Sequence, residues 1–558
     1  MLVLLLAFAA ILDIFSLASF LPMIVLIIKP EQLSSNLYLS GLYRFSGIID
    51  PNTFAVVLTL LAVTLIIIKT RIIIWVTYRK ARFGYDVAQH LVTSEFSKFL
   101  SSPFTRFAGS DYARELNRIT NLPLVFSNNI IIPAGTILSE SVVTILLLSV
   151  IIVIDPQLFL FLTILIIPVF LLYTFQKRKI KKSSEEIKAT YPRLLKYTLQ
   201  GIESFVEVKS FRKEEYFKRR VSEMFAIIGN VFAKDHSRNT AIARITEAIS
   251  AIYLGLIIIY ILLFYPSKED AILILGIYAG VSFRAIPSIN RIFSSFMQIR
   301  THEYTLDELK KSPEESFNAI PEEVVPLKFK DNIQLLGISF AYEEGNRILD
   351  NLNLTIRKGE KIIISGASGR GKTTVLLLLM RFLKQQRGNL LLDGEIVESK
   401  NDLHFRALMG YVPQSPFILD ATIAENIAFG VPTGNIDLNK IQKIIDDLDL
   451  SAWVESLPQK LQTLLGEKGT RISGGQRQRI AIGRVLYSDS QVLLLDEITN
   501  QLDVQSEREV LNILIGLAAR KKTIVLITHK EELWDAFDTV YAFKDQRLER
   551  HLKTEKAP

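Results

Sequence analysis

The chain has 558 residues, far more than a single hydrophobic core usually serves, so about two to four domains are expected. It contains no cysteine, which excludes disulfides, thiolate metal sites and a cysteine nucleophile. The formal net charge is +8, but the excess of Lys and Arg lies beside long apolar runs, where positive loops set membrane orientation. We therefore interpret the charge as membrane topology and not as a nucleic-acid-binding surface.

Six apolar runs are long enough to cross a bilayer as helices, which requires about 20 residues. The first run is not expected to be a cleaved secretion signal, because it lacks a basic start, its apolar part is too long and five more runs follow. Six spans place both ends of the membrane part on one side. The runs cover residues 2–28, 54–76, 130–154, 158–175, 241–264 and 271–297.

The connections between these runs predict their orientation. Those at 77–129 and 176–240 are long, rich in Lys and Arg and amphipathic, so we expect helices that continue into the cytoplasm. The connections at 29–53, 155–156 and 265–270 are short or balanced in charge and are expected to face outward. After the sixth apolar run, a charged stretch with three prolines has few apolar side chains to bury and is predicted to be a linker. The expected domains are a transmembrane domain at 1–310, this linker at 311–326 and a soluble α/β domain at 327–558.

In the soluble domain, an apolar strand at 361–365 leads into the sequence GASGRGKT at 366–373 and then into a helical pattern. In such a strand, P-loop and helix arrangement, glycines let backbone N–H groups turn toward phosphate, and the helix N-terminus adds a favourable field. Lys372 is expected to neutralise the β- and γ-phosphate oxygens, and the Thr373 hydroxyl to ligate Mg²⁺. The expected ATP-binding residues of this segment are Gly366, Ser368, Gly369, Gly371, Lys372, Thr373 and Thr374.

Two further apolar strands end in polar side chains. The strand at 492–495 ends in Asp496 and Glu497, a pair suited to holding Mg²⁺ through water and to polarising an attacking water, respectively. Taken alone, this pair is weak evidence for a magnesium site, because an acidic residue that caps the next helix is equally common at the end of a strand. The strand at 523–528 delivers His529, which beside a P-loop is well placed to sense γ-phosphate, although a lone histidine is usually structural.

The segment Ile472-Ser-Gly-Gly-Gln-Arg-Gln-Arg479 lies about 20 residues before the acidic pair. In this order with the P-loop it resembles the signature motif of the ATP-binding cassette (ABC) family. The resemblance implies that Ser473 and Gly475 bind the γ-phosphate of an ATP held on the P-loop of an opposing subunit. Gly474 and Gln476 belong to the same implied ATP-binding set.

Other motifs resemble the same family. Tyr342 looks like the aromatic residue that stacks on adenine, and Gln414 like the glutamine that reaches the magnesium and couples to the membrane domain. The segment 464–469 resembles the exporter-specific stretch before the signature. Asp503 is retained in the dimer-contact loop and is expected to help bind ATP, while Asn500-Gln501 replaces the commoner Ser-Ala. Glu497, His529 and Gln414 are the expected catalytic residues, and Thr373, Gln414 and Asp496 the expected magnesium ligands.

The resemblance implies a membrane all-α six-helix exporter domain followed by a soluble α/β P-loop ATPase domain with a helical subdomain. One chain supplies half of each ATP site, so a homodimer is expected. Short coupling helices are expected near 107–116 and 203–211, where the alternative is a generic amphipathic surface. The expected cofactors are ATP and Mg²⁺, and the expected location is the bacterial inner membrane with the ATPase in the cytoplasm.

The sixth apolar run contains Arg284 and Arg291, which lie seven residues apart and therefore on one helical face. Intramembrane arginine is costly and usually faces a cavity or a partner. With Arg244, Lys69 and Arg71 these residues are predicted to form a basic belt for an anionic headgroup. The alternative is internal pairing, for instance of Arg244 with Glu247, or extension of the side chains to the inner interface.

The segment around Arg284 looks most like the lipid-linked oligosaccharide flippase branch of bacterial ABC exporters. The predicted function is thus ATP-driven flipping of an anionic lipid-linked substrate, such as a polyprenyl-pyrophosphate oligosaccharide. The alternative is export of other lipids, drugs or peptides by the same mechanism. A non-transporting ATPase regulator is disfavoured by the intact catalytic set, and a nucleic-acid ATPase by the six spans.

Overall fold

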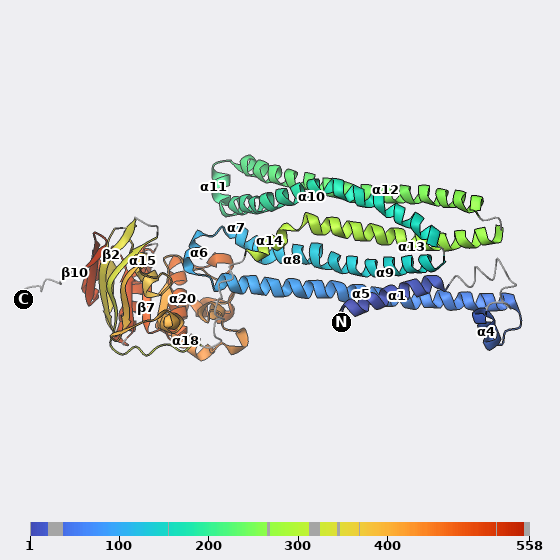
Figure 1. Ribbon diagram of the computed structural model, residues 1–558. Helices are drawn as coiled ribbons and strands as arrows, with labels where there is room; N and C mark the ends of the chain where they lie inside the picture. Colours follow the sequence, from blue (N-terminus) through green and yellow to red (C-terminus); the bar gives the residue numbers. More distant parts are fainter. Residues whose placement is uncertain are drawn as a thin grey trace, which may run out of the picture. The chain divides into compact units, whose positions relative to one another are not determined.

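The computed structural model describes residues 2–19, 37–154, 156–264, 268–311, 324–342, 346–367, 369–500, 502–520 and 522–551. Its contacts divide the chain into two compact units (Figure 1). The first, which we call the helical unit, comprises Met1–Ser102 and Gly109–Asn318. The second, the nucleotide unit, comprises Pro103–Ala108 and Ala319–Pro558. The division after residue 318 falls within the stretch predicted to be a linker.

The described part of the helical unit consists of helices. Its long helices are α1 (Leu2–Ala18), α5 (Pro51–Leu100), α9 (Ile132–Ile154), α10 (Pro156–Glu203), α12 (Glu214–Phe264) and α13 (Lys268–Thr301). Shorter helices are α4 (Leu37–Ser46), α7 (Tyr112–Leu116), α8 (Leu122–Phe126), α11 (Phe205–Ser210) and α14 (Tyr304–Lys310). All but the last residue of a further short helix, α6 (Phe104–Gly109), belongs to the nucleotide unit. Of two π-helical turns, η1 (Asn117–Asn121) precedes the third predicted span and η2 (Ser127–Ile131) overlaps its start.

The predicted spans lie on these long helices, the first one as far as it falls within the described residues. Pro51–Leu100, Tyr112–Ser149 and Glu214–Tyr260 are each long and apolar enough to cross a membrane. The 50 residues of α5 extend for about 75 Å at 1.5 Å per residue, whereas a hydrocarbon core is about 30 Å thick. α5 is therefore much longer than a membrane span, as are α10 and α12. The amphipathic connections predicted such long helices, and their cytoplasmic location stays a prediction.

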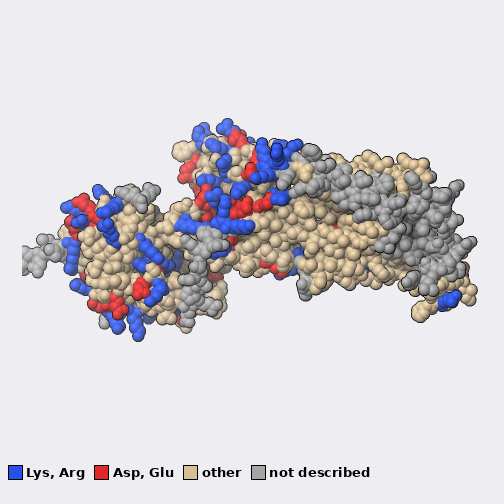
Figure 2. Space-filling view, in the orientation of Figure 1, with Lys and Arg blue, Asp and Glu red and all other residues tan. Residues whose placement is uncertain are grey.

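The helices of this unit run alongside one another (Figure 1). α10 packs beside α12, α9 packs beside both α13 and α1, and α1 packs beside α5. In Figure 2, Lys, Arg, Asp and Glu gather over the part of the unit near α11, while uncharged residues cover its middle. This distribution agrees with an apolar belt that faces lipid and a charged extension that faces water.

The nucleotide unit contains two sheets. A four-stranded antiparallel sheet has the order β2-β1-β4-β5, and a six-stranded sheet has the order β10-β9-β3-β8-β7-β6. In the second sheet β9, β3, β8, β7 and β6 are mutually parallel, so their carboxyl ends meet at one edge. The strands are β1 (Asn332–Ala341), β2 (Arg347–Arg357), β3 (Lys361–Ser365), β4 (Arg387–Leu392), β5 (Glu395–Ile396), β6 (Met409–Val412), β7 (Val492–Asp496), β8 (Thr523–Ile527), β9 (Thr539–Lys544) and β10 (Arg547–His551).

Helices cover both faces of the six-stranded sheet, and its central strands are therefore apolar throughout. Alternate residues of β7 point to opposite cores: Leu494 joins the cluster that holds α15, and Leu495 joins the cluster that holds α20. The helices of this unit are α15 (Lys372–Leu379), α16 (Asp402–Arg406), α17 (Ile423–Ile427), α18 (Leu438–Asp447), α19 (Ser451–Ser456), α20 (Gly474–Tyr487) and α21 (Val504–Ala519). α17, α18 and α19 form the helical subdomain that was predicted.

Residues 103–108 belong to the nucleotide unit, where the ring centroid of Phe104 lies 5.7 Å from that of Phe382. This segment, α6, overlaps the first predicted coupling helix, and α11 overlaps the second.

Gly410 on β6 shows how tightly the sheet packs on α20. A Cβ atom at this position would lie 2.0 Å from Cγ1 of Val485. We expect Gly410→Ala to lower the free energy of unfolding by about 1 to 3 kcal/mol, because the helix has to move away from the strand. Thermal unfolding of the full chain followed by tryptophan fluorescence reports on this, because Trp453 and Trp534 pack against the same core.

Gly434→Ala is the matched control, since a Cβ atom there would meet nothing within 4 Å. If Gly410→Ala and Gly434→Ala unfold at the same temperature, the packing of β6 against α20 is not as described.

Candidate functional site

The P-loop folds around its own lysine. β3 ends at Ser365, and the loop passes through Gly366 and Gly371, which adopts a positive φ of 107°, before α15 begins at Lys372. Lys372 is only 4% exposed, and its Nζ donates hydrogen bonds to the carbonyl oxygens of Gly366 at 2.7 Å and Ala367 at 3.0 Å. Without Cβ atoms at the glycines, the backbone can close tightly around a charged group.

Asp496, at the carboxyl end of β7, lies directly opposite this loop. The hydroxyls of Thr373 and Tyr411 donate to its Oδ2 at 3.1 and 3.2 Å. Burial raises the pKa of Asp496, and burial also raises the pKa of the Tyr411 hydroxyl, which remains a donor. A hydroxyl and a carboxylate side by side are the hard oxygen ligands that Mg²⁺ prefers, so these residues fit a magnesium ion bound together with phosphates.

Glu497 follows in a left-handed backbone conformation, with φ at 51°. One of its oxygens, Oε1, lies 3.4 Å from the ammonium group of Lys372, and the other accepts a hydrogen bond from Nδ2 of Asn500 at 2.8 Å. A residue with a side chain adopts this conformation only where its surroundings enforce it, and such positions cluster at functional sites.

These residues border one cavity of about 500 Å³. Tyr342 is half exposed at its rim, with its hydroxyl 3.3 Å from that of Thr374, so one face of the ring is open for stacking. Gln414 also lines the cavity, and its carbonyl accepts a hydrogen bond from Gln478. The sequence-predicted residues that line the cavity are Tyr342, Gly369, Gly371, Lys372, Thr373, Thr374, Gln414, Asp496 and Glu497.

The remaining predicted residues of the ATP site lie elsewhere. Ser368 is outside the described residues. His529 follows β8, is exposed and is not one of the described residues that line the cavity. Ser473 caps α20 through a capping box with Gln476, and Asp503 caps α21 by accepting from the backbone N–H groups of residues 505 and 506. Gly475 packs so closely on Ser506 that a Cβ atom would lie 3.0 Å from it.

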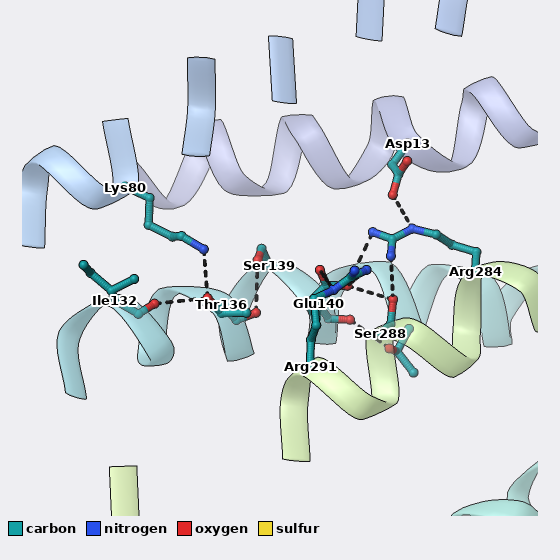
Figure 3. Close-up of polar contacts among 10 residues, drawn as sticks. Asp13, Lys80, Ile132, Thr136, Ser139, Glu140, Arg284, Ser288 and Arg291 are labelled. Carbon is teal, nitrogen blue, oxygen red and sulfur yellow. Dashed lines mark hydrogen bonds and ion pairs between the residues drawn. The ribbon is translucent and has the colours of Figure 1, made fainter. Parts of the chain in front are cut away.

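The helical unit contains a second group of charged side chains, which we call the intramembrane charge cluster: Asp13, Lys69, Glu140, Arg284 and Arg291. Figure 3 shows Asp13, Glu140, Arg284 and Arg291 of this cluster. Lys69 on α5 lies 2.7 Å from Asp13 on α1, which also pairs with Arg284 on α13. Glu140 on α9 lies 2.7 Å from Nε of Arg291 and 3.4 Å from Nη2 of Arg284. Four helices are thus joined by two buried carboxylates.

Hydroxyl groups complete the cluster (Figure 3). Ser288 is fully buried, donates to Glu140 at 2.7 Å and accepts from Arg284 at 3.0 Å. One turn before Glu140, Thr136 accepts a hydrogen bond from Lys80 at 2.8 Å. The charged groups of the cluster and these two hydroxyls are therefore paired, as an apolar environment requires.

The structure brings together three of the five predicted basic residues. Lys69, Arg284 and Arg291 meet through Asp13 and Glu140, two acids that the sequence analysis did not single out. Arg71 is exposed and does not join them, and Arg244 pairs with Glu247 at 3.0 Å on the surface of α12. The internal pairing considered as an alternative is thus present for three of the four arginines, namely Arg244, Arg284 and Arg291. The only signal in the sequence for these two acids is that each is a charged residue inside an apolar run.

Comparisons with known proteins agree with this geometry. Residues 349–500 match the family model described as ABC transporter. An ATP-dependent lipid A-core flippase from Saccharophagus degradans is 28% identical over 377 residues, which are 66% of this chain and 62% of the flippase. The ATP-binding cassette sub-family B member 5 of Mus musculus is 38% identical over 201 residues, which are 36% of this chain and 16% of that protein. This chain therefore matches less than two thirds of the length of either relative.

A solved structure of a bacterial Atm1-family ABC exporter with ATP bound superposes with a TM-score of 0.76. It is 20% identical in sequence, and the match covers 97% of this chain and 93% of that one. The predicted fold class is thereby confirmed. The P-loop and the acidic pair thus lie in a segment that matches the ABC transporter family model, and the chain as a whole has the fold of an ABC exporter.

Proposed function

We propose that this chain is one half of an ATP-driven exporter that flips an anionic lipid-linked substrate, such as a polyprenyl-pyrophosphate oligosaccharide. The observation that carries the proposal is that Lys372, Thr373, Asp496 and Glu497 share one cavity in a chain whose membrane helices also bury a cationic cluster. The chain is then an integral membrane protein with its nucleotide unit in the cytoplasm, and we infer a bacterial inner membrane.

On the nucleotide side, each residue has a distinct task. Backbone N–H groups of the P-loop and the ammonium group of Lys372 bind the β- and γ-phosphates, and Tyr342 stacks on adenine. Thr373, Asp496 and Gln414 would hold magnesium, which would supply positive charge beside the phosphates. Glu497 accepts the proton of the attacking water, and His529 contacts the γ-phosphate.

A second copy of the chain completes the ATP site. Ser473 is exposed at the N-terminus of α20, where unpaired backbone N–H groups and the helix field favour an anion. It does not line the cavity of its own chain, so we assign Ser473, Gly474, Gly475 and Gln476 to the ATP of the partner in a homodimer. Asp503 is assigned to the same contact.

On the membrane side, the charge cluster favours an anion. Three cations share two carboxylates, which leaves the cluster with a net charge of +1, and Lys80 adds another positive charge nearby on α5. Glu140 occupies the Nε and Nη2 edge of Arg291, which is the edge that binds a phosphate in the bidentate manner. We infer that a phosphate headgroup takes the place of Glu140 on this edge. Arg71 and Arg244 are assigned to an outer part of the same substrate path.

The relative named as a lipid A-core flippase supports a lipid substrate, and the polyprenyl chemistry rests on the resemblance of the segment around Arg284. Export of other lipids, drugs or peptides by the same mechanism is the alternative, because the nucleotide site is independent of the cargo.

Replacing Glu497 by Gln tests the nucleotide side. We expect ATP binding to be retained and steady-state phosphate release to fall by about 100-fold or more, the contribution typical of a general base. Phosphate release and equilibrium ATP binding are measured on the full chain in nanodiscs. Glu455→Gln, which removes an exposed carboxylate that pairs with Lys460, is the control. Turnover of Glu497→Gln at the level of this control contradicts the assigned role.

Replacing Arg291 by Gln tests the membrane side, because this side chain is 46% exposed and is the most accessible of the cluster. We expect basal ATPase activity to persist and the concentration of anionic glycolipid that half-maximally stimulates it to rise by about 10-fold, since one charged hydrogen-bonding group is lost. The glycolipid is titrated into nanodiscs that contain the full chain. Arg82→Gln removes an exposed arginine paired with Asp86 and is the control. Equal stimulation of the two variants would assign Arg291 to structure alone.

A further inference from the structure

Asn500 holds one oxygen of Glu497 while the P-loop lysine holds the other. Its Nδ2 donates to Oε2 at 2.8 Å, whereas Oε1 lies 3.4 Å from Nζ of Lys372. Each oxygen of the carboxylate thus has its own donor. The donors differ in kind, because Lys372 is also the group that a phosphate must reach, while Asn500 belongs to the turn that follows Glu497.

The backbone places this amide beside the carboxylate. The N–H of Asn500 donates to the carbonyl oxygen of Glu497 at 3.2 Å, which closes a four-residue turn. The turn begins at the left-handed φ of 51° that Glu497 adopts. A residue with a side chain in this conformation costs free energy, so the surrounding structure has to enforce it. The direction of the Glu497 side chain is therefore determined by the same turn that carries Asn500.

The other end of the Asn500 side chain has no such partner. Its Oδ1 is buried and has no hydrogen-bond partner among the described residues. A buried acceptor without a partner lowers stability, so an amide at this position is a poor choice for folding alone. The hydrogen bond from its Nδ2 to Glu497 is what an asparagine provides here and a smaller apolar residue does not.

Lys372 donates hydrogen bonds to the carbonyl oxygens of Gly366 and Ala367, and its Nζ forms an ion pair with Oε1 of Glu497 at 3.4 Å. Two of the three ammonium hydrogens are thus taken, and the third is the one that a phosphate can reach. A γ-phosphate that binds Lys372 competes with Oε1 for this position and repels the carboxylate, so nucleotide binding releases Oε1 and leaves Oε2 with Asn500.

We propose that Asn500 is a positioning residue that keeps the Glu497 carboxylate in place through Oε2 once a nucleotide has taken Lys372. This inference rests on the proposed role of Glu497 as the base. Oε1 then accepts the proton of water as the water oxygen bonds to the γ-phosphorus, and the bond from that phosphorus to the bridging oxygen breaks. The products are phosphate and ADP, and no other reactant is needed.

Asn500→Ala tests this directly in the full chain. We expect kcat for ATP hydrolysis to fall by about 10-fold, because one hydrogen bond to a charged group is lost, while KM for ATP changes by less than about twofold. Gln505→Ala is the matched control, since it removes an amide that donates to Glu509 at 3.2 Å on the neighbouring helix. Asn500→Gln, which keeps an amide on a longer arm, is expected to recover part of kcat.

A second measurement separates positioning from folding. In the Glu497→Gln background, adding Asn500→Ala is expected to leave the residual turnover unchanged, because Asn500 acts through the carboxylate that is already absent. A kcat of Asn500→Ala equal to that of Gln505→Ala, or a further 10-fold loss in the Glu497→Gln background, overturns the proposal. If instead Glu497→Gln alone keeps full turnover, the role of Glu497 as the base is the part that fails.

Discussion

Lys372 is only 4% exposed, and an ammonium group in such surroundings needs acceptors on all sides. Two carbonyl oxygens of the P-loop and one oxygen of Glu497 supply them. The position of the loop, the acidic pair at the end of β7 and the turn after Glu497 all follow from this one requirement. In the proposed mechanism, a nucleotide phosphate becomes a further acceptor for Lys372. Oε1 of Glu497 is then released and can accept the proton of the attacking water.

The buried charges of the helical unit also need partners, and there the surroundings are apolar. Asp13 and Glu140 are 8% and 11% exposed, and each is shared by two cations from other helices. In an apolar surrounding, removing one partner would leave the other charge unpaired, so the cluster ties α1, α5, α9 and α13 together.

Much of this arrangement could be predicted from the sequence because it depends on neighbouring residues. The P-loop, the capping box at Ser473 and the pair of Arg244 with Glu247 are all local patterns, and the apolar runs predict helices by length alone. The contact of Asn500 with Glu497 is equally local, but it depends on a left-handed backbone at a residue that is not glycine. No simple pattern predicts that conformation.

The pairs that could not be predicted are distant in the chain. Arg284 and Asp13 are 271 positions apart, and Tyr411 reaches Asp496 across 85 positions because β6 and β7 are neighbours in the sheet. The sequence therefore identified the cations of the membrane unit and left their partners unassigned, since the partners depend on how the helices pack.

ATP-dependent movement of a fluorescent polyprenyl-pyrophosphate oligosaccharide across proteoliposomes that contain the full chain tests the central claim most directly. The account predicts translocation that requires ATP and is lost in Glu497→Gln. ATP hydrolysis without movement of this lipid would contradict the assignment of the anionic glycolipid as substrate. Movement that persists in Glu497→Gln would contradict the coupling of that movement to the nucleotide site.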